Sequence, residues 1–380
     1  MAPWGSWYVI RDRIVFWQVR PSPHQAPFVR ALAEALPKRN TVAVFQQPLN
    51  PHRLAMGWHQ PDYGNATVIV DPDSETVERL VADNQEKSVH IFSSMSSNAS
   101  INKILQRCVE TTSLIGILSE GRDPRGVRGF LRRVHSVFHE RSYLRHIDFV
   151  LAIGHVGESW FGTCGYAQKL IFPFGYVVEK PPATNVFSRE KKMVVLTFVG
   201  QIIRRKRVDL LLHALALVTP QNWTLQIVGD GGERPNIERL TKKLNLSGNV
   251  SFLGVIDNSE VREILSKSDV LVLPSRFDGW GAVANESLMC GTPVICSDYC
   301  GVASLLADDI GAVFNHGSVR SLANKLEEWI KKGCLDATRR ERIRNWSGCI
   351  EGPTMARYVL DVIRFVEEET GDRPRPPWTR

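Results

Sequence analysis

The stretch Pro274-Ser-Arg-Phe-Asp-Gly-Trp-Gly-Ala-Val-Ala-Asn-Glu-Ser-Leu-Met-Cys-Gly-Thr-Pro-Val-Ile295 joins a strand pattern to a helix pattern through a glycine turn. The apolar run Val270–Pro274 predicts a buried strand, and the residues after Gly281 predict a helix with Glu286 about two turns from its start. Amides at such a turn and helix N-terminus point toward an anion, and glycine lets the backbone approach it. Asp278 and Glu286, eight positions apart, can accept hydrogen bonds from hydroxyls on either side of that anion. A ligand with a sugar, a diphosphate and a ribose has this layout.

The composition of the chain is that of a globular protein. Its 380 residues are enough for about two domains, and its hydrophobic content of 43% and charged content of 23% are ordinary. We find no apolar run near the ~20 residues that span a bilayer. The N-terminus Met1-Ala-Pro-Trp-Gly-Ser-Trp7 lacks the basic and long apolar regions of a signal peptide, so we expect a cytoplasmic protein.

Charge and cysteine content restrict the partners. The net charge of +7 favours an anionic partner, and the segment from Arg122 to His146 has seven arginines and three histidines against only Asp123 and Glu140. The seven cysteines are widely spread, which disfavours a disulfide framework. A cluster of three of them has no C-x-x-C pair, so buried core residues are favoured over a metal site: Cys290, Cys296 and Cys300.

Two series of short apolar strand patterns alternate with helix patterns. Strands are expected at Arg13–Val19, Thr41–Gln46, Thr67–Val70, Val89–Ser93, Ser113–Ser119 and Phe149–Ile153, then at Met193–Val199, Thr224–Val228, Val250–Leu253, Val270–Leu273, Pro293–Cys296 and Ala312–Phe314. Helices are expected at Pro27–Leu36, Ile101–Glu110, Val208–Leu217, Pro235–Leu244, Glu260–Lys267, Val319–Lys331 and Pro353–Glu369. Such alternation predicts an α/β protein with two doubly wound, mostly parallel sheets.

The expected domain boundaries follow from this pattern. We expect an N-terminal domain over residues 1–180 and a C-terminal domain over 193–350. A polar linker with adjacent prolines, 181–192, separates them. The helix at 351–370 follows the second domain, and the proline-rich tail 371–380 is expected to be disordered.

The loop after the first strand of the C-terminal domain is strongly basic. The strand ends at Gly200, a helix begins near Val208, and Arg204–Arg207 are four consecutive basic residues between them. Ligands of open α/β sheets bind beyond the carboxyl ends of the strands, where cations can neutralise a diphosphate. A solvated basic loop is the alternative. A second glycine turn, Val228–Gly231, is weak evidence for a phosphate site and is equally typical of a plain tight turn.

In the N-terminal domain, three polar residues lie between the first strand and the first helix: Ser22, His24 and Gln25. His24 could orient a hydroxyl, although capping of the helix by Ser22 or a neighbour is an equally good interpretation. Glu120 ends a strand and could be a base on the acceptor side or a partner for Arg122.

The segment Arg125–His146 predicts a basic amphipathic helix. Its apolar residues have helical spacing, while most of its arginines fall off the apolar stripe. The stripe consists of Val127, Phe130, Leu131, Val134 and Phe138. Such a helix suits an anionic membrane surface or a lipid-phosphate acceptor. The alternative is a core helix with a solvated basic face.

These features together resemble the family 4 retaining glycosyltransferases (glycosyl transferases group 1), which have the GT-B fold. The resemblance is clearest from Thr197 to Leu306, where three motifs occur in order. They are Gly200 followed by Lys206 and Asp209–Leu212, the turn Val228–Gly231, and the acid-x7-acid stretch from Asp278 to Glu286. The N-terminal half matches only in layout.

The resemblance implies two Rossmann-like domains facing a cleft, with the final helix crossing back to the N-terminal domain. It implies that Lys206 grips the donor diphosphate, Asp278 contacts the transferred sugar and Glu286 the ribose. The donor-binding set would be Gly200, Gln201, Arg205, Lys206, Gly229, Ser275, Asp278, Gly279, Trp280, Gly281, Ala282 and Glu286. Catalytic roles would fall to Asp278, Lys206 and Glu120, and acceptor binding to Ser22, His24, Gln25 and Arg122.

Three positions depart from the usual family pattern. Asp278 stands where the first acid is usually Glu. Gln201 stands where an arginine usually follows the glycine, and neighbouring arginines could compensate. Many members have a glycine-rich loop after the first strand, where this chain has Pro21–Gln25. Many also have a histidine where this chain has Glu120.

The function that the resemblance implies is retaining transfer of a hexose from a nucleoside diphosphate sugar to an acceptor hydroxyl. The helix dipole at Gly281 would assist Lys206 and nearby arginines in stabilising the leaving group. The scheme requires no metal and no other cofactor. The acceptor would be a glycan or lipid-linked glycan for a surface polysaccharide, and the enzyme would be peripheral on the inner membrane face.

Three alternatives stay open. The first is a GT-B epimerase or phosphorylase, and the second is a catalytically degenerate protein that binds sugar nucleotides. The third, nucleic-acid binding, has no recognisable motif to support it beyond the basic charge, and we expect no nucleic-acid partner.

Overall fold

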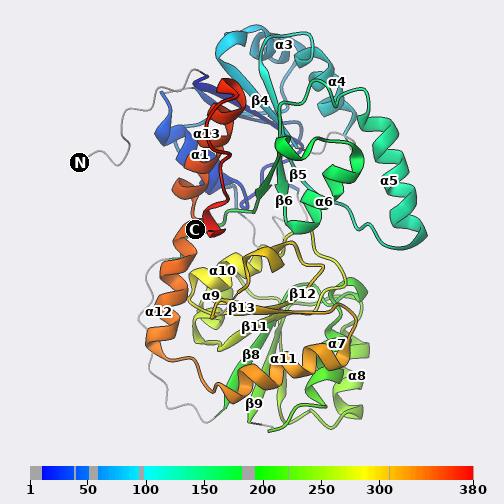
Figure 1. Cartoon of the computed structure of the whole chain (residues 1–380). Coiled ribbons are helices and arrows are strands. Elements are labelled where there is room, and N and C mark those ends of the chain that lie inside the picture. Colours follow the sequence, from blue (N-terminus) through cyan, green and yellow to red (C-terminus); the bar gives the residue numbers. More distant parts are fainter. Residues whose placement is uncertain are drawn as a thin grey trace. The chain divides into compact units, whose positions relative to one another are not determined.

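The computed structural model describes residues 11–37, 40–50, 59–93, 98–181, 193–220, 222–307 and 309–379, which form two compact units (Figure 1). Residues 1–179 and 349–380 form the first unit, and residues 180–348 the second. Nearly all of the expected linker, 182–192, lies outside the described residues.

The first unit contains a seven-stranded parallel sheet in the order β3-β2-β1-β4-β5-β6-β7. Its strands are β1 (Arg13–Gln18), β2 (Thr41–Phe45), β3 (Thr67–Val70), β4 (Ser88–Phe92), β5 (Leu114–Glu120), β6 (Phe149–Ile153) and β7 (Ile171–Phe174). The first six were predicted within a residue or so. β7 was missed because Pro173 interrupts its short apolar run, and proline is tolerated there because β7 is an edge strand.

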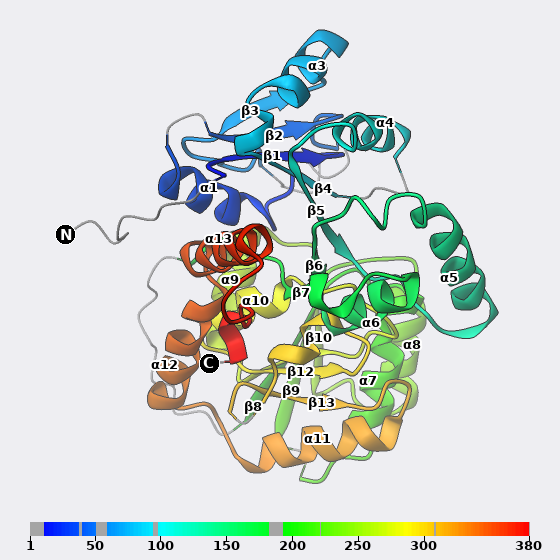
Figure 2. The ribbon, with the colours of Figure 1, turned by 45° about the horizontal axis from the view of Figure 1, so that its top comes forward.

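Helices cover both faces of this sheet (Figure 2). On one face α1 (Ala26–Ala35) packs against α13 (Gly352–Glu368), and Phe28 of α1 contacts Phe174 with 5.3 Å between ring centroids. The other face holds a core formed with α3 (Ser74–Ala82), α4 (Ala99–Cys108) and α6 (His155–Cys164). A further helix, α5 (Gly126–Glu140), packs on α6.

The second unit contains a six-stranded parallel sheet in the order β10-β9-β8-β11-β12-β13. Its strands are β8 (Val194–Val199), β9 (Trp223–Val228), β10 (Val250–Gly254), β11 (Val270–Leu273), β12 (Val294–Ser297) and β13 (Gly311–Phe314). On one face α7 (Val208–Leu215) lies between α8 (Arg234–Lys243) and α11 (Val319–Lys331). On the other, α10 (Val283–Met289) packs against both α9 (Asn258–Lys267) and α12 (Ala337–Trp346).

The predicted α/β fold with two doubly wound sheets is therefore confirmed. Short 3₁₀ helices complete the described structure at Gln85–Lys87, Gln168–Leu170, Arg204–Lys206, Gly301–Leu305, Ser347–Ile350 and Pro377–Thr379. The cysteines at 290, 296 and 300 are buried thiols, as expected of core residues.

The C-terminal tail differs from the expectation of disorder. Arg373 donates hydrogen bonds to the carbonyl oxygens of Gln168 (3.2 Å) and Ile171, and its guanidinium lies 5.1 Å from the ring centroid of Phe172. The tail is thus ordered by contacts with edge strand β7 and the turn before it. Composition predicted disorder because it takes no account of such tertiary contacts.

Candidate functional site

The strand order of the second unit reverses between β8 and β11, so the connections after these two strands leave on opposite faces of the sheet. Such a switch point is where open α/β sheets bind their ligands. Gly200 and Lys206 follow β8, and the segment 275–282 follows β11. The structure therefore places the two principal sequence motifs at one point of the sheet edge.

Each residue of the basic run after β8 has an acidic partner, although the Arg204 side chain is still 91% exposed. Arg204 Nε lies 3.1 Å from Glu233 Oε1, and Arg207 Nε lies 3.0 Å from Asp209 Oδ1. Arg207 also adopts a left-handed conformation, with φ of 54°, at the start of α7. These contacts fix the loop that presents the two basic residues between them.

Lys206 and Arg205 meet Asp278 across the switch point. Lys206 Nζ donates to Asp278 Oδ2, and both side chains are about 15% exposed or less. Arg205 Nη1 lies 3.7 Å from Asp278 Oδ1 and donates to the carbonyl oxygen of Phe277 at 2.8 Å. The structure thus brings Lys206 and Asp278, which are 72 positions apart in the sequence, into direct contact and places Arg205 beside them. Two cations and one carboxylate give the group a net positive charge.

A second loop, residues 297–301, holds the glycine turn in place. Asp278 N donates to Tyr299 O at 2.9 Å, and Gly301 N donates to Asp278 O at 2.9 Å. Gly301 must lack a side chain, because a Cβ there would lie 2.0 Å from Gly279 O. This loop was not predicted as part of the site, although its glycine signals the close backbone approach.

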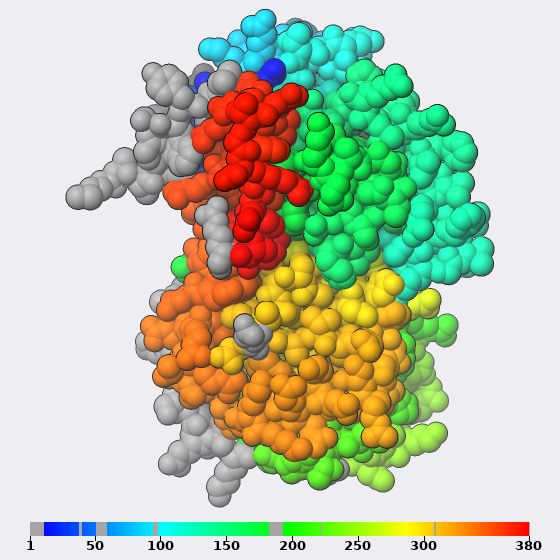
Figure 3. Space-filling view, viewed as in Figure 1, coloured from blue at the N-terminus to red at the C-terminus, as the bar shows by residue number. Residues whose placement is uncertain are grey.

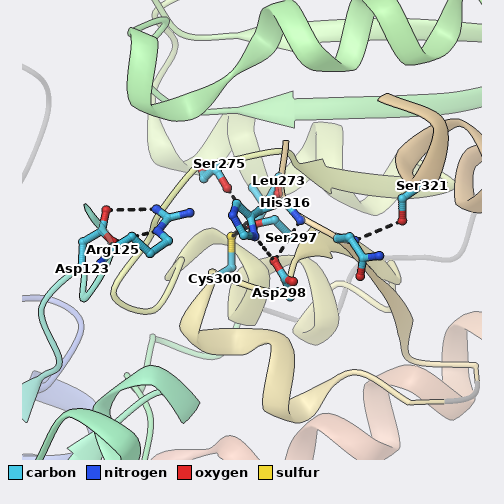
Figure 4. Close-up of polar contacts among 10 residues, drawn as sticks. Asp123, Arg125, Leu273, Ser275, Ser297, Asp298, Cys300, His316 and Ser321 are labelled. Carbon is cyan, nitrogen blue, oxygen red and sulfur yellow. Dashed lines mark hydrogen bonds and ion pairs between the residues drawn. The ribbon is translucent and has the colours of Figure 1, made fainter. Parts of the chain in front are cut away.

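Contacts from the same loop reach the end of β11 (Figure 4). Ser297 Oγ donates to Ser275 O at 2.6 Å, and the Cys300 thiol lies 3.8 Å from Leu273 O. At the outer side, His316 Nδ1 lies 3.0 Å from Asp298 Oδ1. The first two contacts hold the loop against the end of β11.

Two predicted donor-binding residues have buried side chains. Trp280 is fully buried and its Nε1 donates to Asn285 Oδ1 at 2.7 Å, so its backbone is the part available to a ligand. Ser275 is also fully buried, and its side chain faces the protein interior. By contrast, Gln201 is exposed directly after Gly200.

Glu286 lies closer to the start of its helix than predicted. α10 begins at Val283, so Glu286 is in its first turn rather than two turns along. Burial raises the pKa of the Glu286 carboxyl to about 7, and the charge of Arg262 opposes that rise. The residue as a whole is only partly buried.

The turn at Gly229 brings a third loop to the same edge. Gly229 has φ of 120°, and a Cβ there would lie 2.1 Å from Gly200 O, so only glycine fits. Beside this turn lies a pocket of about 350 Å³ that the sequence did not predict. Its lining includes Ile202, Arg204, Arg207, Asp209, Glu233 and Arg276.

In the first unit, a larger pocket of about 630 Å³ lies at the carboxyl edge of the sheet. Four predicted residues line it: Ser22, Gln25, Glu120 and Arg122. His24 does not line it; its ring stacks on Tyr176, which does, with centroids 5.5 Å apart. The structure therefore brings five predicted residues to one place, four directly and one through Tyr176.

The position of Ser22 also bears on the capping alternative. Ser22 O accepts hydrogen bonds from the amides of Gln25 and Ala26, at 3.3 and 3.2 Å, while its hydroxyl accepts from His24 N at 3.3 Å. The N-cap residue of α1 is Gln25, which makes no side-chain capping bond. Ser22 shapes the turn before the helix without capping it by its side chain.

The basic helix α5 buries its polar side and exposes its apolar side, which is the reverse of a core helix. Its buried residues are Gly129, Ser136 and Glu140, none of which has a large apolar side chain. The predicted apolar stripe is exposed instead: Val127 by 77%, Phe130 by 61%, Leu131 by 58%, Val134 by 36% and Phe138 by 72%. α5 forms part of the outer surface of its unit (Figure 3). The sequence predicted the stripe, and the structure shows that it points outward.

The start of α5 is fixed by a local ion pair (Figure 4). Arg125 Nε donates to Asp123 Oδ1 at 2.8 Å, and Arg125 Nη2 donates to Asp123 Oδ2 at 3.0 Å.

Within the described residues, no helix is long and apolar enough to cross a bilayer. The exposed stripe is thus a feature of the surface.

Sequence comparison matches residues 181–346 to the family described as Glycosyl transferases group 1. The chain is also similar to the N-acetyl-alpha-D-glucosaminyl L-malate synthase of Bacillus anthracis, with 32% identity over 152 residues. That match covers 40% of this chain and 39% of the relative. The chain spans less than half of the length of the curated relatives it matches.

Structure comparison extends over nearly the whole chain. Anabaena HepE in complex with UDP has a TM-score of 0.67 and 16% identity, covering 94% of this chain and 99% of that one. The lipopolysaccharide outer core galactosyltransferase WaaB, in its apo form, has a TM-score of 0.66, 16% identity and the same coverage. The chain therefore has the GT-B fold of solved glycosyltransferases, and residues 181–346 match the model of the Glycosyl transferases group 1 family.

Proposed function

We propose that this protein is a family 4 retaining glycosyltransferase that transfers a hexose from a UDP- or GDP-sugar to an acceptor hydroxyl. The observation that supports this most is the meeting of Lys206, Arg205 and Asp278 at the switch point of a group 1 domain. Two cations there suit a diphosphate, and a carboxylate beside them suits sugar hydroxyls. A structural neighbour, Anabaena HepE, was solved with UDP.

In the proposed mechanism, Lys206 and Arg205 bind the diphosphate and offset the charge that develops on it as the sugar leaves. The amides of Gly279–Gly281 add hydrogen bonds to the phosphates. α10 has only seven residues, so we assign the larger effect to the side chains rather than to its dipole. Neutralisation of the leaving group is thus assigned to protein groups, and we propose no metal or other cofactor.

Asp278 and Glu286 are assigned to hydroxyl groups of the donor. We propose that Asp278 contacts the transferred hexose and that Glu286 accepts a hydrogen bond from the ribose. Backbone groups of Gly200, Gln201, Gly229 and Ala282 would complete the donor site. Trp280 and Ser275 would contribute through their backbone, because their side chains are buried.

The acceptor is assigned to the pocket of the first unit. Ser22, Gln25 and Arg122 line this pocket and would bind the acceptor, with His24 positioning Tyr176. Glu120 would accept a proton or a hydrogen bond from the reacting hydroxyl. We propose a glycan or lipid-linked glycan acceptor, in surface polysaccharide synthesis.

We further propose that α5 docks the protein on the inner face of an anionic membrane. Its stripe of five exposed apolar residues is larger than the scattered apolar residues usual on a surface. Arg128 and Arg132 beside it are exposed, whereas Glu140, the one acidic residue of this helix, is buried. Apolar insertion combined with attraction to acidic lipids is the binding mode of interfacial helices.

Release of nucleoside diphosphate from UDP- and GDP-hexoses would test the transferase proposal. We expect release from one donor, stimulated by an acceptor glycan, with transfer of the sugar to that glycan. Proton NMR of the product should show the anomeric configuration of the donor. Conversion of the donor sugar without an acceptor would indicate an epimerase, and binding without turnover a degenerate enzyme.

Co-sedimentation with lipid vesicles would test the membrane proposal. We expect binding to vesicles that contain phosphatidylglycerol and much weaker binding to pure phosphatidylcholine, with the difference reduced by salt because surface charge is screened. Equal binding to both, or to neither, would contradict docking by α5.

A further inference from the structure

The inner face of α5 contributes a buried carboxyl group to the pocket of the first unit. Glu140 lines this pocket and is only 6% exposed. Its Oε2 makes no hydrogen bond of good geometry within the described residues; the hydroxyls of Ser136 and Tyr166, which also make none, lie near enough to stabilise its charge. A buried polar atom of this kind is costly unless something satisfies it. The buried Glu140 oxygen is therefore available to accept a hydrogen bond from a ligand.

The surroundings of Glu140 partly stabilise its charge. Burial raises the pKa of Glu140, while the hydroxyls of Tyr166 and Ser136 and the charge of Arg122 oppose the rise. Arg122 also lines the pocket. The carboxyl is therefore placed as a hydrogen-bond acceptor close to a fixed cation.

Two guanidinium groups line the same pocket. Arg122 comes from the loop after β5, and Arg132 comes from α5, where its Nη1 donates to Asp123 O at 3.4 Å. Guanidinium groups suit phosphate because they offer several donors in one plane. Trp160 and Phe161 give the pocket an apolar wall. Its lining thus combines cations, a buried carboxyl and aromatic surface.

We infer that this pocket binds an acceptor head group that has a phosphate next to free hydroxyls. Arg122 and Arg132 bind the phosphate, and Glu140 accepts a hydrogen bond from a hydroxyl. The inference rests on the proposed function, since it names the class of acceptor for the same site. It also gives α5 two roles, because one helix lines the pocket with its polar face and exposes its apolar stripe to a membrane.

The phosphate could belong to a soluble molecule or to a lipid, and paired ligands distinguish the two. In the soluble arm, calorimetry measures binding of glycerol phosphate, inorganic phosphate and glycerol to the full chain. In the lipid arm, sedimentation compares vesicles of phosphatidylglycerol with vesicles of phosphatidylserine, which has the same net charge but no free hydroxyl. Each arm is run with the wild type and with Glu140→Gln, Arg122→Gln and Arg132→Gln.

We expect one arm to show a preference for phosphate with hydroxyls, and Glu140→Gln to reduce it about tenfold, the usual size for a hydrogen bond to a charged group. Glu140→Gln should leave binding of inorganic phosphate unchanged, whereas the arginine variants should weaken all phosphate ligands. If neither arm shows the preference, or if it survives in Glu140→Gln, the inference is overturned.

A control variant and a second ligand keep the outcome clear. Glu86→Gln removes an exposed carboxylate of the same unit that does not line the pocket, and it should bind like the wild type. UDP and GDP binding to each variant reports whether the second unit is folded and active in binding. If neither nucleotide binds the wild type but the pocket preference is found, the proposed transferase is wrong and the pocket assignment still stands.

Discussion

The two units share a doubly wound architecture but build their candidate sites differently. In the second unit, short loops hold Lys206 and Asp278 in direct contact, and the glycine turns fit against each other. In the first unit, the candidate site is an open pocket with a buried carboxyl, that of Glu140, whose Oε2 lacks a well-formed hydrogen bond within the described residues. Under the proposed function, the donor would bind to a site that is already formed, whereas the acceptor would complete its site by binding.

Two helices of the first unit sharpen this contrast. α13 buries its apolar face, including Val359 and Ile363, against the sheet and α1. α5 buries glycine and polar residues and exposes its apolar face, including Phe138. Both have an amphipathic pattern, so periodicity alone predicts a stripe without predicting which side of it faces the core.

The largest effect should follow from changing the acid of the switch point. Asp278→Asn should lower transfer about 10²–10³-fold, because it removes a charged contact to the reacting sugar. UDP or GDP affinity should be kept or raised, since Asp278 no longer pairs with Lys206. Steady-state kinetics and calorimetry measure the two effects, with Asp257→Asn, an exposed acid of the same unit, as the control. Loss of nucleotide affinity together with transfer would contradict the separate roles.

The contrast between α13 and α5 predicts effects of different size on the free energy of unfolding. Ile363→Ala should lower the free energy of unfolding by about 2–5 kcal/mol, because it leaves a cavity in a packed core. Phe138→Ala should change it by less than about 0.5 kcal/mol, as expected for an exposed site. Urea denaturation of the full chain measures both. A large loss in Phe138→Ala would mean that the stripe is buried within the protein.

The same stripe should matter for lipid binding. Replacing Phe130 and Phe138 together by serine should weaken binding to phosphatidylglycerol vesicles about tenfold or more, since each side chain can bury apolar surface in the bilayer. Nucleotide binding should not change. Val255→Ser, at another exposed apolar residue, is the matched control. Unchanged vesicle binding in the double variant would remove α5 as the docking element.

The smallest effect expected is the dependence of nucleotide binding on pH. The pKa of Glu286 is about 7, so this carboxyl is largely protonated below that pH. A ribose hydroxyl donates best to the ionised form, so UDP or GDP affinity should rise with pH up to about 7 and then level off. Because only one group titrates, the affinity should change by no more than about tenfold per pH unit. The affinity of Glu286→Gln should lack the part of the pH dependence that comes from this carboxyl and keep the part that comes from titration of the phosphates. An identical pH profile in the variant would count against the ribose role.

The sequence predicted the second unit better than the first. Its strands were placed correctly, and the glycine turns and Asp278 lie at strand ends as expected, because such residues have strong local signals. The support from residues 297–301 was missed, since Gly301 signals a close backbone approach without indicating which segment approaches it. Glu286 was misplaced by one turn, because the helix start depends on the path of the backbone after Gly281.

In the first unit the misses have a different cause. α3, α6 and β7 gave weak patterns, although Asp73 caps α3 by accepting a hydrogen bond from Thr76 N. Glu140 was noted only as a charge, because its burial depends on how α5 packs. Pockets made from several loops depend on tertiary packing that local patterns do not describe.

Titration of UDP and GDP against the wild type and Lys206→Ala tests most directly whether the switch point of the second unit binds a nucleoside diphosphate. The proposal predicts that one of the two nucleotides binds and that the matching nucleoside, which has no phosphates, binds at least about 100-fold more weakly. In Lys206→Ala, most of this difference in affinity between nucleotide and nucleoside should be lost. Lys267→Ala, at an exposed lysine paired with Glu263, should behave like the wild type. Binding of neither nucleotide, or equal binding by wild type and Lys206→Ala, would contradict it.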